Sequence, residues 1–394
     1  MAYLKGLCLA VCVGLVFFFM TGCGSGNKVT AVQFTSGQAA SVVIGQADFT
    51  SGSANRGGAV GANTLNESYA EPFVASGVMY LPDENNNRTL VYNSIPTTNG
   101  ASADFAIGQA NLTSSGSGTS ATAVYCPEQA VISNGKMIQA DYCNHRIIIY
   151  NTVPTSSPGT IDVVVGQPNK TSNTSGCTAS TLHNPESVVT AGGKLIVTDG
   201  DNSRVLIWNT IPTTDGAAAD VVLGQTSFTS CSKNGGGTVG ASTFSYPAGM
   251  WSDGTRLAVA DYDNNRVLIW NSIPTNNNQA ADLVLGQANF TDISCNRGGS
   301  ATASTLCDPY DGVYFTSAQM FVGDENNNRV LIWNSFPTTN GQAADVVLGE
   351  PNMTTTTNGT SATLMNNPTG MFLYNKQLIV SDTQNARYLI FNGN

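Results

Sequence analysis

Short apolar runs, each bounded by Gly, Pro, Asn or Asp, follow one another along most of this chain. In one representative stretch the runs cover residues 186–190, 194–199, 204–209 and 219–224. They are too short for buried helices, and the residues between them are those that form turns. The pattern therefore predicts groups of four short strands. Because several runs are apolar without alternation, we expect the sheets to be covered on both faces.

A repeat organises these groups. An Asp is followed five residues later by an Arg, across a polar segment and before an apolar run, in six places: Asp83 and Arg88, Asp141 and Arg146, Asp199 and Arg204, Asp261 and Arg266, Asp324 and Arg329, and Asp382 and Arg387. Successive copies lie 58 to 63 residues apart. This period suits a propeller blade with a long loop and is too long for a helical solenoid unit. Six of the nine arginines occupy this one position, so we expect the pairs to be structural ion pairs.

A second marker, Gly-Gln or Gly-Glu, indicates how the repeat closes. It follows each of the first five Asp residues by 25 positions, whereas the sixth Asp has no marker and the first marker, at Gly45, has no Asp before it. Residues 39–46 would then supply the strand that is missing after Phe391. We predict an all-β, six-bladed β-propeller of four-stranded antiparallel blades over residues 38–394. An N-terminal strand joins the C-terminal blade, which closes the ring and removes exposed strand edges.

The pattern Asp-x-x-Asn-x-Arg, preceded by an apolar strand, resembles the NHL repeat. At 195–205 it reads Leu-Ile-Val-Thr-Asp-Gly-Asp-Asn-Ser-Arg-Val, and residues 144–146 read Asn-His-Arg. The resemblance implies a six-bladed propeller with the Asp and the Arg at the ends of the second and third strands of a blade. NHL propellers serve as interaction platforms in many proteins, and some relatives are lyases or lactonases, so the resemblance implies either kind of function.

The first 22 residues have the layout of a secretory signal. One Lys, Lys5, precedes an apolar run at 6–20 that is too short for a membrane-spanning helix, and Met-Thr-Gly-Cys follows at 20–23. These four residues resemble a bacterial lipobox, although an ordinary signal peptide with a chance Cys is the alternative. We predict a lipoprotein signal peptide at 1–22, a lipidated Cys23 and a tether at 23–37. The propeller would then be lipid-anchored in the bacterial cell envelope, on the periplasmic side of a membrane or at the cell surface.

Charge and cysteine content restrict the partners and the compartment. Without residues 1–22 the chain keeps 15 basic and 26 acidic residues, an acidic balance that repels nucleic acid. Six cysteines remain besides Cys23, an even number that suggests disulfides in an exported protein. From their positions in the blades we pair Cys126 with Cys143, Cys177 with Cys231, and Cys295 with Cys307, among fifteen possible connectivities.

The leading hypothesis is a non-catalytic scaffold. A monomeric, lipid-anchored propeller would bind a protein, peptide or glycan through its long loops, with no cofactor. The Asn-rich segments at 83–87 and 324–328 contain oxygen ligands suited to calcium, but they lack the spacing of an EF-hand and are better explained as turns.

The alternative hypothesis is a metal-dependent lyase or hydrolase with its site at the mouth of the central channel. The chain has two histidines, His145 in a repeat turn and His183 just before an expected inner strand. Acidic residues occur at related positions, and the candidate site consists of Glu128, His183, Glu186, Asp308 and Asp311. Calcium or zinc would be held by four of them: Glu128, His183, Asp308 and Asp311. Among these, His183, Glu186 and Asp311 would be the catalytic residues, although an exposed loop His is the simpler account of His183.

Overall fold

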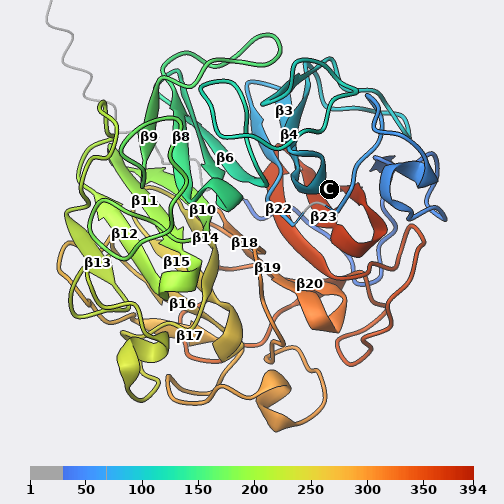
Figure 1. The fold of residues 1–394 in the computed structure, drawn as a ribbon. Coiled ribbons are helices and arrows are strands. Elements are labelled where there is room, and N and C mark those ends of the chain that lie inside the picture. Colours follow the sequence, from blue (N-terminus) through green and yellow to red (C-terminus); the bar gives the residue numbers. More distant parts are fainter. Residues whose placement is uncertain (1–29, 68) are drawn as a thin grey trace, which may run out of the picture. The chain divides into compact units, whose positions relative to one another are not determined.

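Six four-stranded antiparallel sheets are arranged in a ring and form a six-bladed β-propeller (Figure 1). The structure is a computed structural model that describes residues 30–67 and 69–394. The predicted signal peptide at 1–22, Cys23 and the first part of the predicted tether lie outside the described residues. Within the described part of the chain, no helix is both long and apolar enough to cross a membrane.

Each blade runs from an innermost strand beside the channel to an outermost strand at the rim. In that order, blade 1 contains β2 (Phe73–Ala75), β3 (Val78–Asp83), β4 (Arg88–Tyr92) and β5 (Phe105–Ile107). Blade 2 contains β6 (Pro127–Ser133), β7 (Lys136–Asp141), β8 (Arg146–Tyr150) and β9 (Val163–Val165). Blade 3 contains β10 (Pro185–Ala191), β11 (Lys194–Asp199), β12 (Arg204–Trp208) and β13 (Val221–Leu223). Blade 4 contains β14 (Pro247–Ser252), β15 (Leu257–Asp261), β16 (Arg266–Trp270) and β17 (Leu283–Leu285). Blade 5 contains β18 (Val313–Phe315), β19 (Met320–Asp324), β20 (Arg329–Trp333) and β21 (Val346–Leu348). Blade 6 contains β22 (Pro368–Tyr374), β23 (Gln377–Asp382), β24 (Arg387–Asn392) and β1 (Val42–Ile44).

Short 3-10 helices are the helical elements of the described residues. Six of them connect the second and third strands of the blades: η2 (Glu84–Asn86), η3 (Tyr142–Asn144), η4 (Gly200–Asn202), η6 (Tyr262–Asn264), η8 (Glu325–Asn327) and η9 (Thr383–Asn385). Three more lie in long loops: η1 (Ala54–Gly57), η5 (Lys233–Gly236) and η7 (Cys295–Gly298).

The N-terminal strand closes the ring, as predicted. β1 pairs with β24, so that Val42 lies opposite Ile390 and Ile44 lies opposite Tyr388. The innermost strands contact one another in the order β2, β6, β10, β14, β18 and β22, and β22 contacts β2. The innermost strands therefore surround a central channel. Because Pro185 at the start of β10 pairs with Asp199, these strands begin at the end of the channel where the repeat Asp turns lie.

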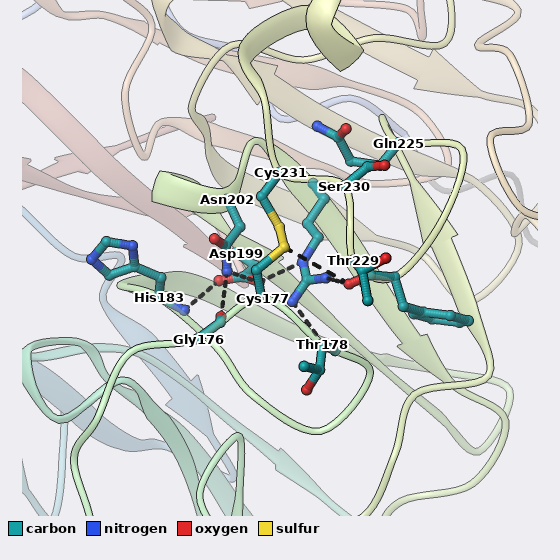
Figure 2. Close-up of a disulfide and its surroundings, with 12 residues drawn as sticks. Gly176, Cys177, Thr178, His183, Asp199, Asn202, Gln225, Thr229, Ser230 and Cys231 are labelled. Carbon is teal, nitrogen blue, oxygen red and sulfur yellow. Dashed lines mark hydrogen bonds and ion pairs between the residues drawn. A yellow bond between two sulfur atoms is a disulfide. The ribbon is translucent and has the colours of Figure 1, made fainter.

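Each repeat Asp forms a buried ion pair with its Arg. In blade 3, Arg204 Nε donates to Asp199 Oδ2 at 2.7 Å, and neither side chain is exposed. The backbone N–H of His183 donates to Asp199 Oδ1 at 2.7 Å, and Asn202 donates to Oδ2 at 2.9 Å (Figure 2). Arg204 Nη2 also donates to the Thr178 carbonyl at 2.9 Å. The ion pair recurs in all six blades at 2.6 or 2.7 Å, so each one joins a turn to the long loop before its blade.

The Gly-Gln marker connects the outermost strand to the same turn. The Gln225 amide donates to the Ser203 carbonyl at 3.0 Å and to the Ser232 carbonyl at 2.8 Å. Ser203, which ends the turn, has the left-handed φ of +50°. Gly224 has a φ of +84°, and a Cβ there would lie 2.4 Å from the Phe244 ring. A glycine is therefore required at the marker.

Three disulfides tie the long loops, with the pairing expected from the sequence: Cys126–Cys143, Cys177–Cys231 and Cys295–Cys307. The second joins the loops that precede blades 3 and 4, beside the Asp199 turn (Figure 2). Three disulfides suggest an oxidising, extracytoplasmic environment.

Candidate functional site

Carboxyl groups line the channel at the end next to the Asp–Arg turns. Glu128, Glu186 and Asp311 each lie thirteen residues before the repeat Asp of their blade, at 141, 199 and 324, so they occupy one repeat position. Glu128 and Glu186 are the second residues of β6 and β10, and Asp311 lies just before β18. One oxygen of each lies within 4.8 Å of an oxygen of the other two. All three residues are at most 2% exposed. We call these three residues the carboxylate triad.

Two glycines allow the acidic segments of blades 5 and 1 to reach the channel. A Cβ at Gly249 in β14 would lie 2.4 Å from the backbone carbonyl of Asp311, and one at Gly370 in β22 would lie 2.4 Å from Glu71 Cα. The Gly249 N–H donates to the Tyr310 carbonyl at 3.0 Å. Neighbouring blades therefore pack backbone against backbone at this end of the channel, and the position of each acid depends on the blade beside it.

Tyrosine hydroxyls hold Glu186. Tyr310 donates to Glu186 Oε1 at 2.9 Å, and Tyr246 donates to the same oxygen. The hydroxyls of Tyr142 and Tyr246 lie 3.1 Å apart and are hydrogen-bonded to each other. Oε2 of Glu186 is buried and has no hydrogen-bond partner among the residues that the structure describes. One oxygen of Glu186 is thus fixed, and the other is available to a ligand.

Other carboxyl oxygens at this end of the channel are also buried and without a hydrogen-bond partner in the described chain. Within residues 30–67 and 69–394, both oxygens of Asp311 and of Glu71 are buried without a hydrogen-bond partner, as is one oxygen each of Glu128, Glu84 and Glu325. No Lys or Arg of the described chain forms an ion pair with any of them; the basic partners found there belong to other acids. A buried carboxylate is costly unless it is paired with a positive charge, and the described residues place none beside this cluster.

Burial raises the pKa of every carboxyl in this cluster. For Glu128, Asp311 and Glu71 the pKa lies well above the ordinary range, because burial is reinforced by neighbouring carboxylates. Burial raises the pKa of Glu186 to about 8, although the two tyrosine hydroxyls that donate to it act in the opposite direction. For Glu84 and Glu325, nearer the outside, burial raises the pKa to about 7. A bound cation would favour the ionised forms.

The opposite end of the channel is apolar. Phe73, Trp251 and Phe372 line a cavity of about 230 Å³ there, together with residues from β6 and β10. Their rings are in contact, with centroids 5.0 Å apart for Phe73 and Phe372 and 5.5 Å apart for Trp251 and Phe372. This aromatic layer gives the channel one acidic end and one apolar end.

The structure brings together three of the five residues of the predicted channel-mouth site, namely Glu128, Glu186 and Asp311. His183 is not part of this group: its side chain is 38% exposed, and its Nε2 lies 3.4 Å from Asp201 Oδ2. The ring of His183 packs against that of His145, with centroids 5.2 Å apart.

Asp308 also lies outside the carboxylate triad, because it is hydrogen-bonded to Asn326 on the η8 turn. The Asn-rich segments are turns in which the Asn three residues after the repeat Asp binds that Asp. Asn86 donates to Asp83 Oδ2 at 2.9 Å, and Asn327 donates to Asp324 Oδ2 at 2.8 Å.

Several residues of the site were not part of the predicted channel-mouth site, although Glu84 and Glu325 belong to the Asn-rich segments that were considered for calcium. In blade 1 the repeat position of the triad is Ala70, and Glu71 is the next residue. A second repeat position, the residue after the repeat Asp, contributes Glu84, Tyr142, Tyr262 and Glu325. Alignment of the six units on the Asp would have revealed both positions, because they differ between blades while the Asp and Arg do not.

The carboxylate triad can hold a metal ion through oxygen atoms alone. Carboxylate oxygens suit hard cations such as calcium or magnesium, and the wide coordination of calcium tolerates irregular sites. Zinc normally takes Cys or His ligands, and neither occurs in the triad. The orphaned oxygens of Asp311 and Glu186 fit this interpretation.

No family model matches the chain, and no curated protein matches it. Solved structures do: the computationally designed Ika8 protein is 11% identical over 92% of this chain and 98% of that chain, with a TM-score of 0.43. A proposed 6-phosphogluconolactonase from Bacteroides fragilis NCTC 9343 is 13% identical over 84% of this chain and 81% of that chain, with a TM-score of 0.45. Likenesses this distant carry no information about function, and the NHL resemblance stays a prediction.

Proposed function

We propose that this protein is a lipid-anchored, extracytoplasmic propeller that binds a divalent cation at the acidic end of its channel and recognises its ligand there. The observation that supports this proposal most is the carboxylate triad. Oxygens of Glu128, Glu186 and Asp311 lie within 4.8 Å of one another, and all three side chains are buried. A divalent cation would supply the missing charge, and calcium is the best fit to an all-oxygen site.

The proposal narrows the idea of a scaffold that binds a protein, peptide or glycan through its long loops. The disulfides Cys126–Cys143 and Cys295–Cys307 hold the loops close to the triad, since Cys126 precedes Glu128 by two residues and Cys307 precedes Asp311 by four. Loops fixed in this way would form the rim of a channel-mouth site. The partner would therefore contact the rim and the cation together.

Calcium titration tests the proposal. The mature protein is freed of metal with a chelator and titrated with calcium chloride in a calorimeter, alongside the variants Glu128→Gln and Asp311→Asn. The control variant is Asp292→Asn, which removes an exposed acid of a long loop. We expect one saturable site in the unaltered protein and in Asp292→Asn, and its loss in the two triad variants. Absence of calcium binding by the folded, unaltered protein would contradict the proposal.

A metal-dependent lyase or hydrolase is the second candidate. The observation in its favour is that Tyr246 and Tyr310 place two hydroxyl groups on Glu186. A cation in the triad would polarise a carbonyl group or acidify a bound water, and the hydroxyls could carry a proton beside it. A panel of lactones and esters, tested with and without calcium, would show turnover that Tyr310→Phe reduces while calcium binding is retained. If no substrate in the panel is turned over, the binding function is favoured.

The lipid anchor is tested separately. Mass spectrometry of the N-terminal peptide from the native membrane fraction should show a lipid mass increment on Cys23. A Cys23→Ala variant cannot carry the lipid, so a chain from which the signal segment has been removed should be released into the soluble fraction, because no acyl chain then holds it to the membrane. Recovery of an unmodified Cys23 from the membrane fraction would count against the anchor.

A further inference from the structure

Outside the carboxylate triad, four tyrosine rings form a continuous wall. Tyr310 is at its centre: its ring centroid lies 5.8 Å from that of Tyr69, 5.0 Å from that of Tyr262 and 6.1 Å from that of Tyr246, which is stacked on it. Tyr246 and Tyr262 are also in contact, at 6.0 Å. All four residues are half-buried, so part of the wall faces solvent. We call these four residues the tyrosine wall.

Two carboxyl groups, those of Glu325 and Glu84, lie near the tyrosine wall. Glu325 is 8% exposed; its Oε1 accepts a hydrogen bond from Asn367 at 3.0 Å, whereas its Oε2 is buried and finds no partner in the described chain. Oε2 of Glu84 is likewise buried and has no hydrogen-bond partner among the described residues. Glu325 occupies the same repeat position as Tyr262, directly after the repeat Asp of the neighbouring blade. Burial raises the pKa of the Tyr69 hydroxyl to about 12, and the carboxyls of Glu67, Glu325 and Glu84 act in the same direction.

The charge of the site restricts what binds there. The three ionised carboxylates of a cation-loaded triad exceed the charge of one divalent cation. Glu84 and Glu325, whose pKa burial raises to about 7, add part of a negative charge each at neutral pH. A phosphate or carboxylate ligand would therefore be repelled. An aromatic face attracts a cation through its quadrupole, and tyrosine rings combined with carboxylates are a setting in which organic ammonium groups are bound.

We infer that the tyrosine wall and Glu325 form a second, outer site that binds an organic ammonium group. The ligand would be a small molecule or a partner side chain with a methylated or primary amine. This inference rests on the proposed function, because it assigns the ligand that the cation-loaded channel recognises. The carboxylate triad binds the metal, and the outer site provides the selectivity for the amine.

Choline and its uncharged carbon analogue, 3,3-dimethyl-1-butanol (dimethylbutanol below), test the inference. The two have the same shape and differ in the positive charge, so their comparison isolates the ammonium group. In calorimetry with excess calcium, choline should bind saturably and dimethylbutanol should bind at least about tenfold more weakly. Equal binding of the two compounds, or no binding of choline, would overturn the inference.

Substitutions in the tyrosine wall and at Glu325 test whether choline binds at the outer site. Tyr262→Leu removes a ring of the wall and should weaken choline binding roughly fivefold to tenfold, whereas Tyr262→Phe keeps the ring and should change it less than about twofold. Glu325→Gln should also weaken it. The control is Tyr374→Leu, at the far end of β22, with no effect expected. Choline binding that is the same in Tyr262→Leu and Tyr262→Phe would overturn the assignment.

The two proposals fail in different ways. Calcium affinity is measured in the same variants, and Tyr262→Leu and Glu325→Gln should leave it within about twofold, since neither residue belongs to the triad. Calcium binding without choline binding overturns the outer site alone. Displacement of choline by added calcium would place choline in the triad and would likewise overturn the outer site. Absence of calcium binding overturns the proposed function itself.

Discussion

Raising the pH of the cation-free protein should lower its free energy of unfolding. Burial raises the pKa of Glu186 from 4.5 to about 8 in the folded protein. A carboxyl with such a raised pKa contributes its full stability below the unfolded-state pKa, and this contribution is lost as the pH rises through the folded-state pKa. One pKa unit corresponds to about 1.4 kcal/mol, so Glu186 alone removes about 2 to 3 kcal/mol between pH 5 and 7, and on the order of 5 kcal/mol in all.

The other carboxyls of the cluster act in the same direction, and burial raises the pKa of Glu128, Asp311 and Glu71 well above the ordinary range. Burial raises the pKa of Glu84 and of Glu325 from 4.5 to about 7, so their contributions are lost between about pH 4.5 and 7. A divalent cation binds the ionised carboxylates and not the protonated ones, so it should restore the lost stability. The increase in stability caused by calcium should therefore be small near pH 5 and should grow toward pH 8.

Urea unfolding followed by tryptophan fluorescence measures these effects. The protein is unfolded at several pH values between about 5 and 8, with a chelator or with excess calcium. Glu186→Gln, which cannot ionise, should reduce the slope of the pH dependence in the chelator, because the other buried carboxyls still contribute to it. The exposed-site control Asp292→Asn should reproduce the unaltered curve. A chelated protein whose stability stays constant or rises across this range would refute the argument that these carboxyls are buried without a cation.

The scaffold and the packing of the channel give three further predictions. Arg204→Ala leaves Asp199 buried and unpaired and should cost about 3 to 5 kcal/mol in urea unfolding. Lys233→Ala, which breaks a pair whose side chains are 71% and 31% exposed, should cost about 1 kcal/mol or less. Gly249→Ala places a Cβ 2.4 Å from the Asp311 carbonyl, so it should lower the free energy of unfolding by about 1 to 3 kcal/mol and weaken calcium binding. The control Gly116→Ala should leave both quantities unchanged, because its Cβ would meet no atom of the described residues within 4 Å. Replacing Cys126 and Cys143 by Ser opens a loop of 17 residues and should cost about 3 kcal/mol; unchanged stability in the double variant would show that the bond is dispensable.

The blades could be predicted because their signals are local. The Asp and Arg of one turn are five residues apart, and the Gly-Gln marker lies on the next strand but one, so a single unit contains the whole arrangement. The closure of the ring followed from counting strands at the two ends. The turn and the marker depend on hydrogen bonds within one unit. The closure joins the two ends of the chain, but it could be inferred because each end lacks the strands that the other supplies.

The channel site was only partly predictable because it depends on contacts between blades. Glu128 and Glu186 follow a Pro that marks the start of an innermost strand, and that signal is visible in the sequence. The approach of Asp311 and Glu71 depends on Gly249 and Gly370 in other blades, far away in the chain.

His183 lies where the simpler account of the sequence, an exposed loop His, puts it, and not in the channel, although Glu186 is only three residues away in the chain. Its backbone N–H is fixed by Asp199 at 2.7 Å, before β10 begins, and its side chain turns toward Asp201. Proximity in sequence to an inner strand therefore does not imply access to the channel.

The six blades share one framework, but they form a single site because the residues at two repeat positions differ from blade to blade. At the position of the triad the blades carry Ala70, Glu128, Glu186, Ala248, Asp311 and Thr369, and after the repeat Asp they carry Glu84, Tyr142, Gly200, Tyr262, Glu325 and Thr383. If all six blades carried an acid at the first position, the mutual repulsion would be too large for one cation to offset. The neutral residues of blades 1, 4 and 6 limit this position to three carboxyls, whose charge one divalent cation offsets except for one negative charge. The scaffold therefore requires the positions that repeat, and cation binding requires the positions at which the blades differ.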